Sequence, residues 1–183
     1  MNSKKLAWKS LKFIDNKMKS SYGDITWKIG EWKEESQIKL CNYGFHASKM
    51  LIDAYQYVTP DLFAQVEYEG EILEDTDKFV AKRMRVIKAY KWTKTDSMNF
   101  SIFCVQQSMK YFDRKKYPEV WTVCLNSIRA IKDVLNNDND DTRSAAESAA
   151  ESAAWSAESA ARKVQNKWLI KYVKTNCEEI KCN

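Results

Sequence analysis

The chain has little of what catalytic and phosphate-binding sites require. It contains one histidine, His46, and four glycines among 183 residues. A single histidine excludes a metal site or a proton relay built from several histidines of this chain, and no glycine-rich phosphate loop or dinucleotide fingerprint occurs. Five cysteines, an odd number without close pairs, argue against a disulfide framework and a thiolate zinc cluster. We therefore expect no catalytic residues, no metal site and no cofactor.

Long apolar runs are also missing. The longest uncharged apolar stretches are far shorter than the roughly 18 residues that a membrane-spanning helix needs. The first residues, Met1 to Lys5, are not followed by an apolar segment of the signal-peptide type. We expect a cytoplasmic protein without a membrane partner, and 44% hydrophobic residues are sufficient for a packed core.

The distribution of glycine separates the chain into two parts. All four glycines lie at or before Gly70, among short segments that alternate apolar and polar residues, such as 25–29 and 63–68. Ser48 as N-cap and Pro60 as a stop predict one helix within this part. Apolar residues beyond Asp96 recur with the helical period. The sequence predicts an α+β fold: residues 1–95 form a small, mainly antiparallel sheet with one helix, and residues 96–183 form a helical region with helices at about 98–112, 118–135 and 142–174.

The last predicted helix is rich in alanine. Serine-alanine-alanine triplets repeat from Ser144, and alanine is the strongest helix former. Its small residues form a narrow seam suited to close helix packing. The seam either covers the preceding helices of the same chain or pairs two chains, so that the protein is a monomer or a homodimer. The self-association residues of this hypothesis are Ala150, Ala154, Ala157, Ala161 and Trp168.

A basic stripe is the clearest candidate for an interaction surface. No acidic residue occurs from Lys78 to Lys94, and aromatic residues between the basic ones can stack on bases. Two alternatives remain, because tryptophans also serve as core anchors and the glutamates of residues 67–74 can pair with the stripe across neighbouring strands. The predicted partner- or nucleic-acid-binding residues are Lys82, Arg83, Arg85, Lys88, Tyr90, Lys91, Trp92 and Lys94.

The turn around His46 is the second candidate. The sequence from Cys41 to Ser48 is Cys-Asn-Tyr-Gly-Phe-His-Ala-Ser. A structural histidine is the favoured interpretation, because nothing nearby supplies a catalytic partner or an oxyanion hole. The alternative is a ligand pocket lined by Phe45, His46, Ser48 and Tyr57.

Several of these motifs together resemble a known group of domains. The Cys41–His46 turn, Asp53-Ala54, Val66-Glu67 before Gly70-Glu71, and the segment 77–83 resemble a family of uncharacterised domains common in phages and prophages. The resemblance covers about residues 7–90. Length and motif combination also resemble Cas9-inhibiting anti-CRISPR proteins. This resemblance implies a phage- or mobile-element-encoded inhibitor that binds Cas9 in a bacterial host cell without catalysis, with DNA as a further contact.

A second resemblance competes with the first. The segment from Gly44 to Ser48, the helix to Tyr57 and the strand to Gly70 are similar to the nicotinamide-side signature of ADP-ribosyltransferases. This similarity implies an ADP-ribosyltransferase-like enzyme or an NAD-binding domain with His46 in the place of a stacking aromatic residue. The chain departs from the pattern, because no arginine occurs before Arg83.

Overall fold

The computed structural model describes residues 5–137 and 159–181. The described residues fall into two compact units. The sheet unit takes in residues 1–92 and 168–183, and the helical unit takes in residues 93–167. The predicted boundary at residue 95 did not anticipate the return of residues 168–183 to the sheet unit.

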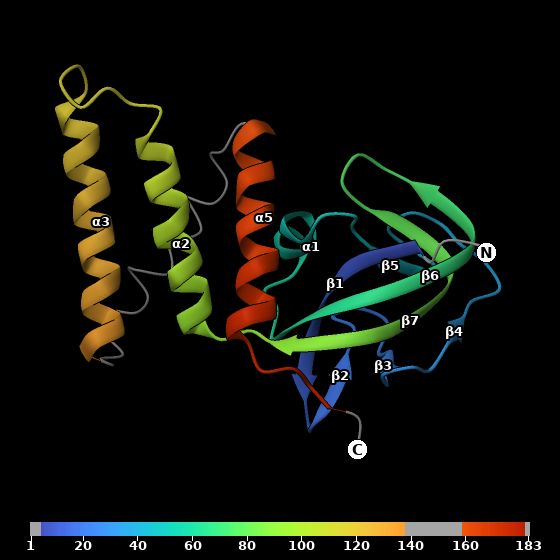
Figure 1. Cartoon of the computed structure of the whole chain (residues 1–183). Helices are drawn as coiled ribbons and strands as arrows, with labels where there is room; N and C mark the ends of the chain where they lie inside the picture. The colour runs from blue at the N-terminus through green and yellow to red at the C-terminus, as the bar shows by residue number, and fades with distance from the viewer. Residues whose placement is uncertain (1–4, 138–158, 182–183) are drawn as a thin grey trace. The chain divides into compact units, whose positions relative to one another are not determined.

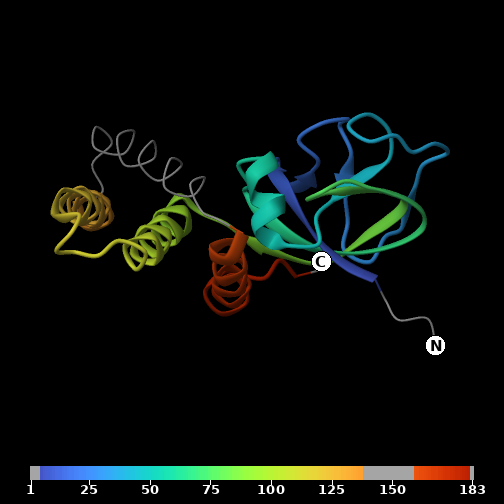
Figure 2. The ribbon, with the colours of Figure 1, turned by 90° about the horizontal axis from the view of Figure 1, so that it is seen from above.

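The sheet unit contains a curled sheet in which the named strands pair antiparallel (Figures 1 and 2). The strand order is β3-β2-β1-β6-β7-β4, and β5 also pairs with β7. This arrangement, together with the helices that follow it, confirms the predicted α+β class. The strands are β1 (Lys5–Ile14), β2 (Lys17–Lys19), β3 (Thr26–Trp27), β4 (Lys33–Glu34), β5 (Phe45–Ala47), β6 (Leu62–Glu74) and β7 (Phe79–Lys91).

Strand β7 is a central strand of the sheet and pairs with neighbours along both of its edges. One of its edges pairs with β6 over nearly its full length. The other edge is shared by β5, β4 and two further segments. The Gly30 amide donates to the Val86 carbonyl at 2.8 Å, and the Ile180 amide donates to the Ala89 carbonyl at 2.8 Å. These short segments cover an edge that would otherwise be open to pairing with another chain.

The core follows from strand periodicity, because alternate side chains point to the same face. One face of the sheet carries a continuous apolar cluster, and the other carries an aromatic group. In the aromatic group, Phe63 lies 4.9 Å from Trp92, which lies 6.0 Å from Tyr172 between ring centroids. The buried cluster consists of Ala7, Leu11, Met18, Trp27, Phe45, Ala47, Leu62, Ala64, Val66, Tyr68, Phe79, Ala81, Met84, Val86 and Ala89.

Helix α1 (Leu51–Tyr57) begins later than predicted. Its N-cap is Met50, without a side-chain hydrogen bond. The predicted cap, Ser48, is wrong because the Ser48 backbone pairs with Trp8 in both directions, at 2.8 and 2.9 Å. That pairing fixes the entry to the helix in place of a cap.

The helical unit contains α2 (Lys94–Met109) and α3 (Pro118–Asn137). A capping box starts α2, since the Asp96 amide donates to the Thr93 hydroxyl at 3.2 Å and the Thr93 amide donates to the Asp96 carboxylate at 2.8 Å. The two helices pack through two small apolar clusters, one around Ile131 and one around Ile128. None of the helices in the described ranges is long and apolar enough to cross a membrane.

Helix α5 (Ser159–Asn176) passes from the helical unit into the sheet unit. It overlaps the later part of the helix predicted at 142–174, and residues 142–158 lie outside the described residues. The predicted seam residues Ala150, Ala154 and Ala157 lie outside the described residues, and Ala161 lies in α5. The Trp168 ring stacks on Tyr172 with centroids 4.7 Å apart. Pairing of two chains through this helix stays a prediction.

Candidate functional site

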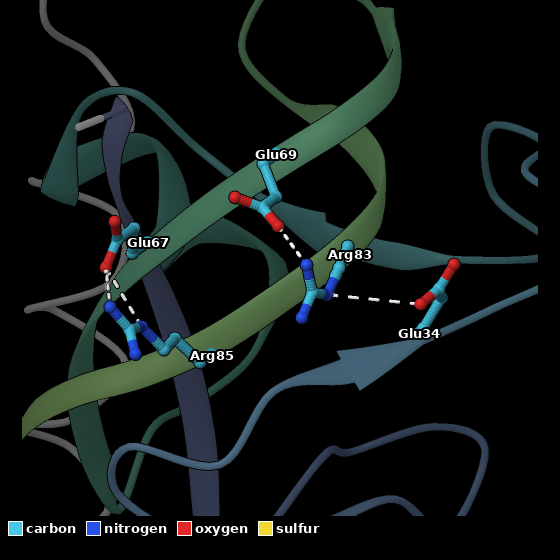
Figure 3. A network of polar contacts seen from close by, with 5 residues as sticks. All are labelled: Glu34, Glu67, Glu69, Arg83 and Arg85. Carbon is cyan, nitrogen blue, oxygen red and sulfur yellow. Dashed lines mark hydrogen bonds and ion pairs between the residues drawn. The ribbon is translucent and has the colours of Figure 1, made fainter. Parts of the chain in front are cut away.

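Two arginines of β7 form a charged ladder with glutamates of the neighbouring strands (Figure 3). The strand register places Glu67 opposite Arg85 and Glu69 opposite Arg83. Arg85 donates from Nε and Nη2 to Glu67 Oε2 at 2.9 and 2.6 Å. Arg83 donates to Glu69 and lies 3.9 Å from Glu34 of β4. Directly opposite residues in an antiparallel pair lie close enough for such contacts.

Trp32, just before β4, lies against both arginines. The guanidinium carbons of Arg83 and Arg85 are 4.7 and 4.6 Å from the centroid of the Trp32 ring. The ring is half-buried, and stacking of cations on an indole is favourable. We call Trp32, Arg83 and Arg85 with Glu34, Glu67 and Glu69 the Trp–Arg surface. Its charges sum to two minus three, or −1.

The structure changes the interpretation of the predicted basic stripe. Besides the two arginines, Lys88 lies 3.0 Å from Glu179, and Lys91 lies 2.9 Å from Glu178. The hydrogen bond with Glu179 raises the pKa of Lys88. Most of the positive charge of the stripe is therefore compensated by acidic neighbours. Pairing with Glu67 and Glu69 is the alternative that the sequence had left open. The residues Glu178 and Glu179 were not anticipated, because they lie far along the sequence.

The aromatic members of the stripe require a correction. Tyr90 and Trp92 are only 4% and 5% exposed, so their rings do not present a stacking surface. Of the other members, Lys82 is half-buried, and Lys94 is an exposed residue that begins α2 in the helical unit. The side chain missed by sequence reasoning is Trp32. Its partners lie some fifty residues away, and the two-residue strand β4 has no periodicity that could reveal them.

The Gly-Phe-His turn is a closely packed piece of backbone. Gly44 has a φ of +95°, and a Cβ atom there would lie 2.6 Å from Val80 Cγ2 and 2.9 Å from Ile38 Cγ2. Cys41 also has a positive φ of 62°. The Cys41 amide donates to His46 Nε2 at 2.9 Å. The imidazole therefore closes the turn that the glycine makes possible.

The surroundings of His46 favour the neutral form of its ring. Burial lowers its pKa, and the charges of Lys9 and Lys78 lower it further, whereas a hydrogen bond to the Gly44 backbone acts in the opposite direction. Because Nε2 accepts a hydrogen bond, protonating the ring would break the contact with Cys41. The Cys41 side chain itself is exposed.

The predicted pocket residues Phe45, Ser48 and Tyr57 differ in exposure and in partners. Phe45 is 2% exposed and packs edge-on against Trp27 at 5.3 Å, and Ser48 is 2% exposed. Tyr57 is 42% exposed, its hydroxyl donates to Asp77, and Lys78 Nζ lies 4.5 Å above its ring. A pocket for NAD stays a prediction. Within residues 5–137 and 159–181, no group of three or more histidine, cysteine, aspartate or glutamate residues could hold a metal ion.

The fold and site together describe an α+β protein with a charged, aromatic-bearing sheet face. Residues 8–98 are similar to a family described as a domain of unknown function, DUF7666. The match begins within β1 and extends through β7 to the first turns of α2. No curated protein and no solved structure matches the chain.

Proposed function

We propose that this protein acts by binding another protein and not by catalysing a reaction, and that its target is the CRISPR nuclease Cas9. In this proposal it is a phage- or mobile-element-encoded inhibitor that works in a bacterial host cell. The proposal that the protein is not an enzyme rests on the structural role of His46. It is the one histidine of the chain, and its ring makes main-chain hydrogen bonds that close the Cys41–His46 turn.

The Trp–Arg surface supports protein binding. Tryptophan and arginine are the residues that most often dominate the energy of protein interfaces. The two guanidinium groups are already fixed by glutamates and by the indole ring, so little side-chain freedom is lost when a partner binds. The net charge of −1 on this surface does not favour the phosphates of a nucleic acid. A protein surface of mixed charge fits it better.

The choice of Cas9 rests on the sequence resemblance. The motifs that resemble phage-borne domains and Cas9 inhibitors lie within residues 7–90, and this range includes every residue of the Trp–Arg surface. DNA contact, which the resemblance also implies, would need lysines outside this surface. A filter-binding titration across salt concentrations tests it, because phosphate contacts give a steep salt dependence.

A cleavage assay with purified Cas9, guide RNA and target DNA tests the proposal. We expect the wild-type chain to co-purify with Cas9 and to reduce cleavage until a fixed molar ratio is reached. Trp32→Ala should weaken binding about tenfold or more. Tyr22→Ala is the matched control, since Tyr22 is 82% exposed and is not part of the Trp–Arg surface, and it should bind like the wild type.

Two outcomes would contradict the proposal in different ways. Unaffected cleavage without co-purification removes Cas9 as the target. Inhibition at far below one molecule per Cas9 that requires NAD, with label transfer abolished by His46→Ala, would instead support the ADP-ribosyltransferase interpretation.

A further inference from the structure

The connection between helices α2 and α3 gathers aromatic and basic residues on the surface of the helical unit (Figure 1). Residues 110–117 read Lys-Tyr-Phe-Asp-Arg-Lys-Lys-Tyr, and every one of them is exposed. Tyr111 has 66% of its surface exposed, and Trp121, in the first turn of α3, is half-buried. We call residues 110–117 with Trp121 the aromatic–basic loop. It offers the exposed rings that the buried Tyr90 and Trp92 do not.

Contacts within the aromatic–basic loop hold its rings in place. The rings of Phe112 and Tyr117 meet edge-on with centroids 6.0 Å apart. Trp121 Nε1 donates to the Phe112 carbonyl at 2.8 Å. The Asp113 carboxylate accepts hydrogen bonds from the backbone amides two and three residues further on, at 2.7 and 3.1 Å. Because the loop is already ordered, little conformational freedom is lost when it binds a ligand.

The positive charges of this loop are not compensated. In the part of the chain that the structure describes, no ion pair involves any of its four cations, which are Lys110, Arg114, Lys115 and Lys116. Residues 110–117 carry four positive charges and one negative charge, or +3, and Glu119 in the first turn of α3 reduces the sum to +2. Unlike the Trp–Arg surface, this loop therefore attracts anions.

We propose that the aromatic–basic loop binds a single-stranded nucleic acid, whose bases stack on the exposed rings and whose phosphates contact the unpaired cations. Proteins that bind single strands combine these two features. The loop places them side by side, since the Arg114 guanidinium carbon lies 5.5 Å from the centroid of the Trp121 ring, and Lys116 Nζ lies 5.2 Å from that of Tyr117. The loop lies outside residues 7–90, so this inference does not rest on the proposed binding to Cas9.

Two other anionic partners fit this loop less well. The bases of a duplex are stacked on one another, so a duplex offers its phosphates but no free base faces to the exposed rings. An anionic membrane surface favours apolar side chains that enter the lipid. Residues 110–117 contain no aliphatic residue, and the rings of Phe112 and Tyr117 are engaged with each other.

Fluorescence anisotropy of a labelled oligothymidylate of about 15 nucleotides, titrated with the full chain, tests the proposal. We expect the affinity to fall with salt, with a slope of about −3 in log K against log salt if all four cations contact phosphates. Tyr111→Ala should weaken binding about fivefold or more without changing the slope, because one stacked base is lost. Lys115→Gln should make the slope less steep by about 0.7. An oligouridylate of the same length tells whether DNA or RNA binds more tightly, and binding of either supports the proposal.

Matched variants separate this loop from the rest of the chain. Tyr111→Phe keeps the ring and should bind like the wild type. Lys132→Gln removes one positive charge from an exposed position of α3, about 20 Å along the helix from Pro118, and should leave the slope unchanged. No binding of either strand, equal binding of a duplex of the same length, wild-type binding by Tyr111→Ala, or equal slopes for Lys115→Gln and Lys132→Gln would each overturn the proposal. Binding to phosphatidylglycerol vesicles but to neither oligonucleotide would identify the loop as a membrane contact instead.

Discussion

The basic side chains on the two faces of the sheet differ in the partners that compensate their charge. On the outer face, Arg83 and Arg85 each have a glutamate and the Trp32 ring as partners. On the inner face, which carries the buried apolar cluster, Lys9 has one backbone carbonyl and the Trp27 ring as partners, and no carboxylate among the described residues. Compensated charges near solvent contribute little to stability, whereas an isolated charge in an apolar place is costly. The charges of the outer face therefore have partners already in place, whereas the inner face holds a charge that costs stability.

The largest expected effect is at Gly44, where the backbone packs closely against Val80 of β7. Gly44→Ala should lower the free energy of unfolding by about 3 kcal/mol or more, because the new Cβ meets Val80 and Ile38 at a positive φ. Gly30→Ala is the control, since Gly30 has a φ of +84° but no atom within 4 Å of the added carbon. It should cost about 1 to 2 kcal/mol. Urea unfolding followed by circular dichroism measures both, and equal losses would contradict the close packing.

The next effect sharpens the contrast at Lys9 through pH. The pKa of Lys9 is about 8 in the folded chain and 10.5 ordinarily. As pH rises through this window the folded state releases the proton first, so stability is gained, by up to about 3 kcal/mol at pH 10.5. Below pH 8 the gain is absent. The measurement is the difference in unfolding free energy between wild type and Lys9→Met across this pH range, and a difference independent of pH would be contrary evidence.

The two ion pairs of the Trp–Arg surface, Arg85–Glu67 and Arg83–Glu69, should contribute differently to stability. Glu67 is 12% exposed at its side chain and Glu69 is 47% exposed. We expect Glu67→Gln to lower the unfolding free energy by about 2 kcal/mol, because Arg85 is left half-buried without its counterion. Glu69→Gln should cost about 1 kcal/mol or less. Chemical denaturation of both variants in parallel checks this ranking, and the reverse order would show that exposure does not set the strength of these pairs.

The smallest effect is expected at the exposed pair of Lys88 and Glu179, whose side chains are 48% and 44% exposed. Lys88→Gln should leave the unfolding transition unchanged within error, at low and at high salt. A clear loss in a thermal melt would mean that residues 178–180 depend on this ion pair and not on their backbone hydrogen bonds.

Elements set by local pattern could be predicted from the sequence. Helix α3 was expected at 118–135 and spans Pro118–Asn137, because Pro118 and a 3.6-residue apolar period mark it. A strand around residues 63–68 was expected and belongs to the longer β6. These signals are contained in a few consecutive residues.

Features set by pairing between distant segments could not be predicted. The position of Trp32 between two arginines depends on the register of β4 against β7, which no local period reports. Ser48 likewise could not be assigned from local sequence, because its backbone pairs with the distant Trp8 and it does not cap the helix. Lys9 was not singled out because a lysine among apolar residues of a strand looks the same whether it points inward or outward, until the register is known.

The arrangement of the chain also orders its folding. In the sequence, residues 93–167 of the helical unit separate the two segments that form the sheet unit. The segment that pairs with β7 near Ala89 follows them. A growing polypeptide therefore reaches residue 167 before the Ala89 carbonyl and the Lys91 amide of β7 can find their backbone partners in residues 178–180. We expect this end of β7 to be open to pairing with a second copy until Ile180 is in place.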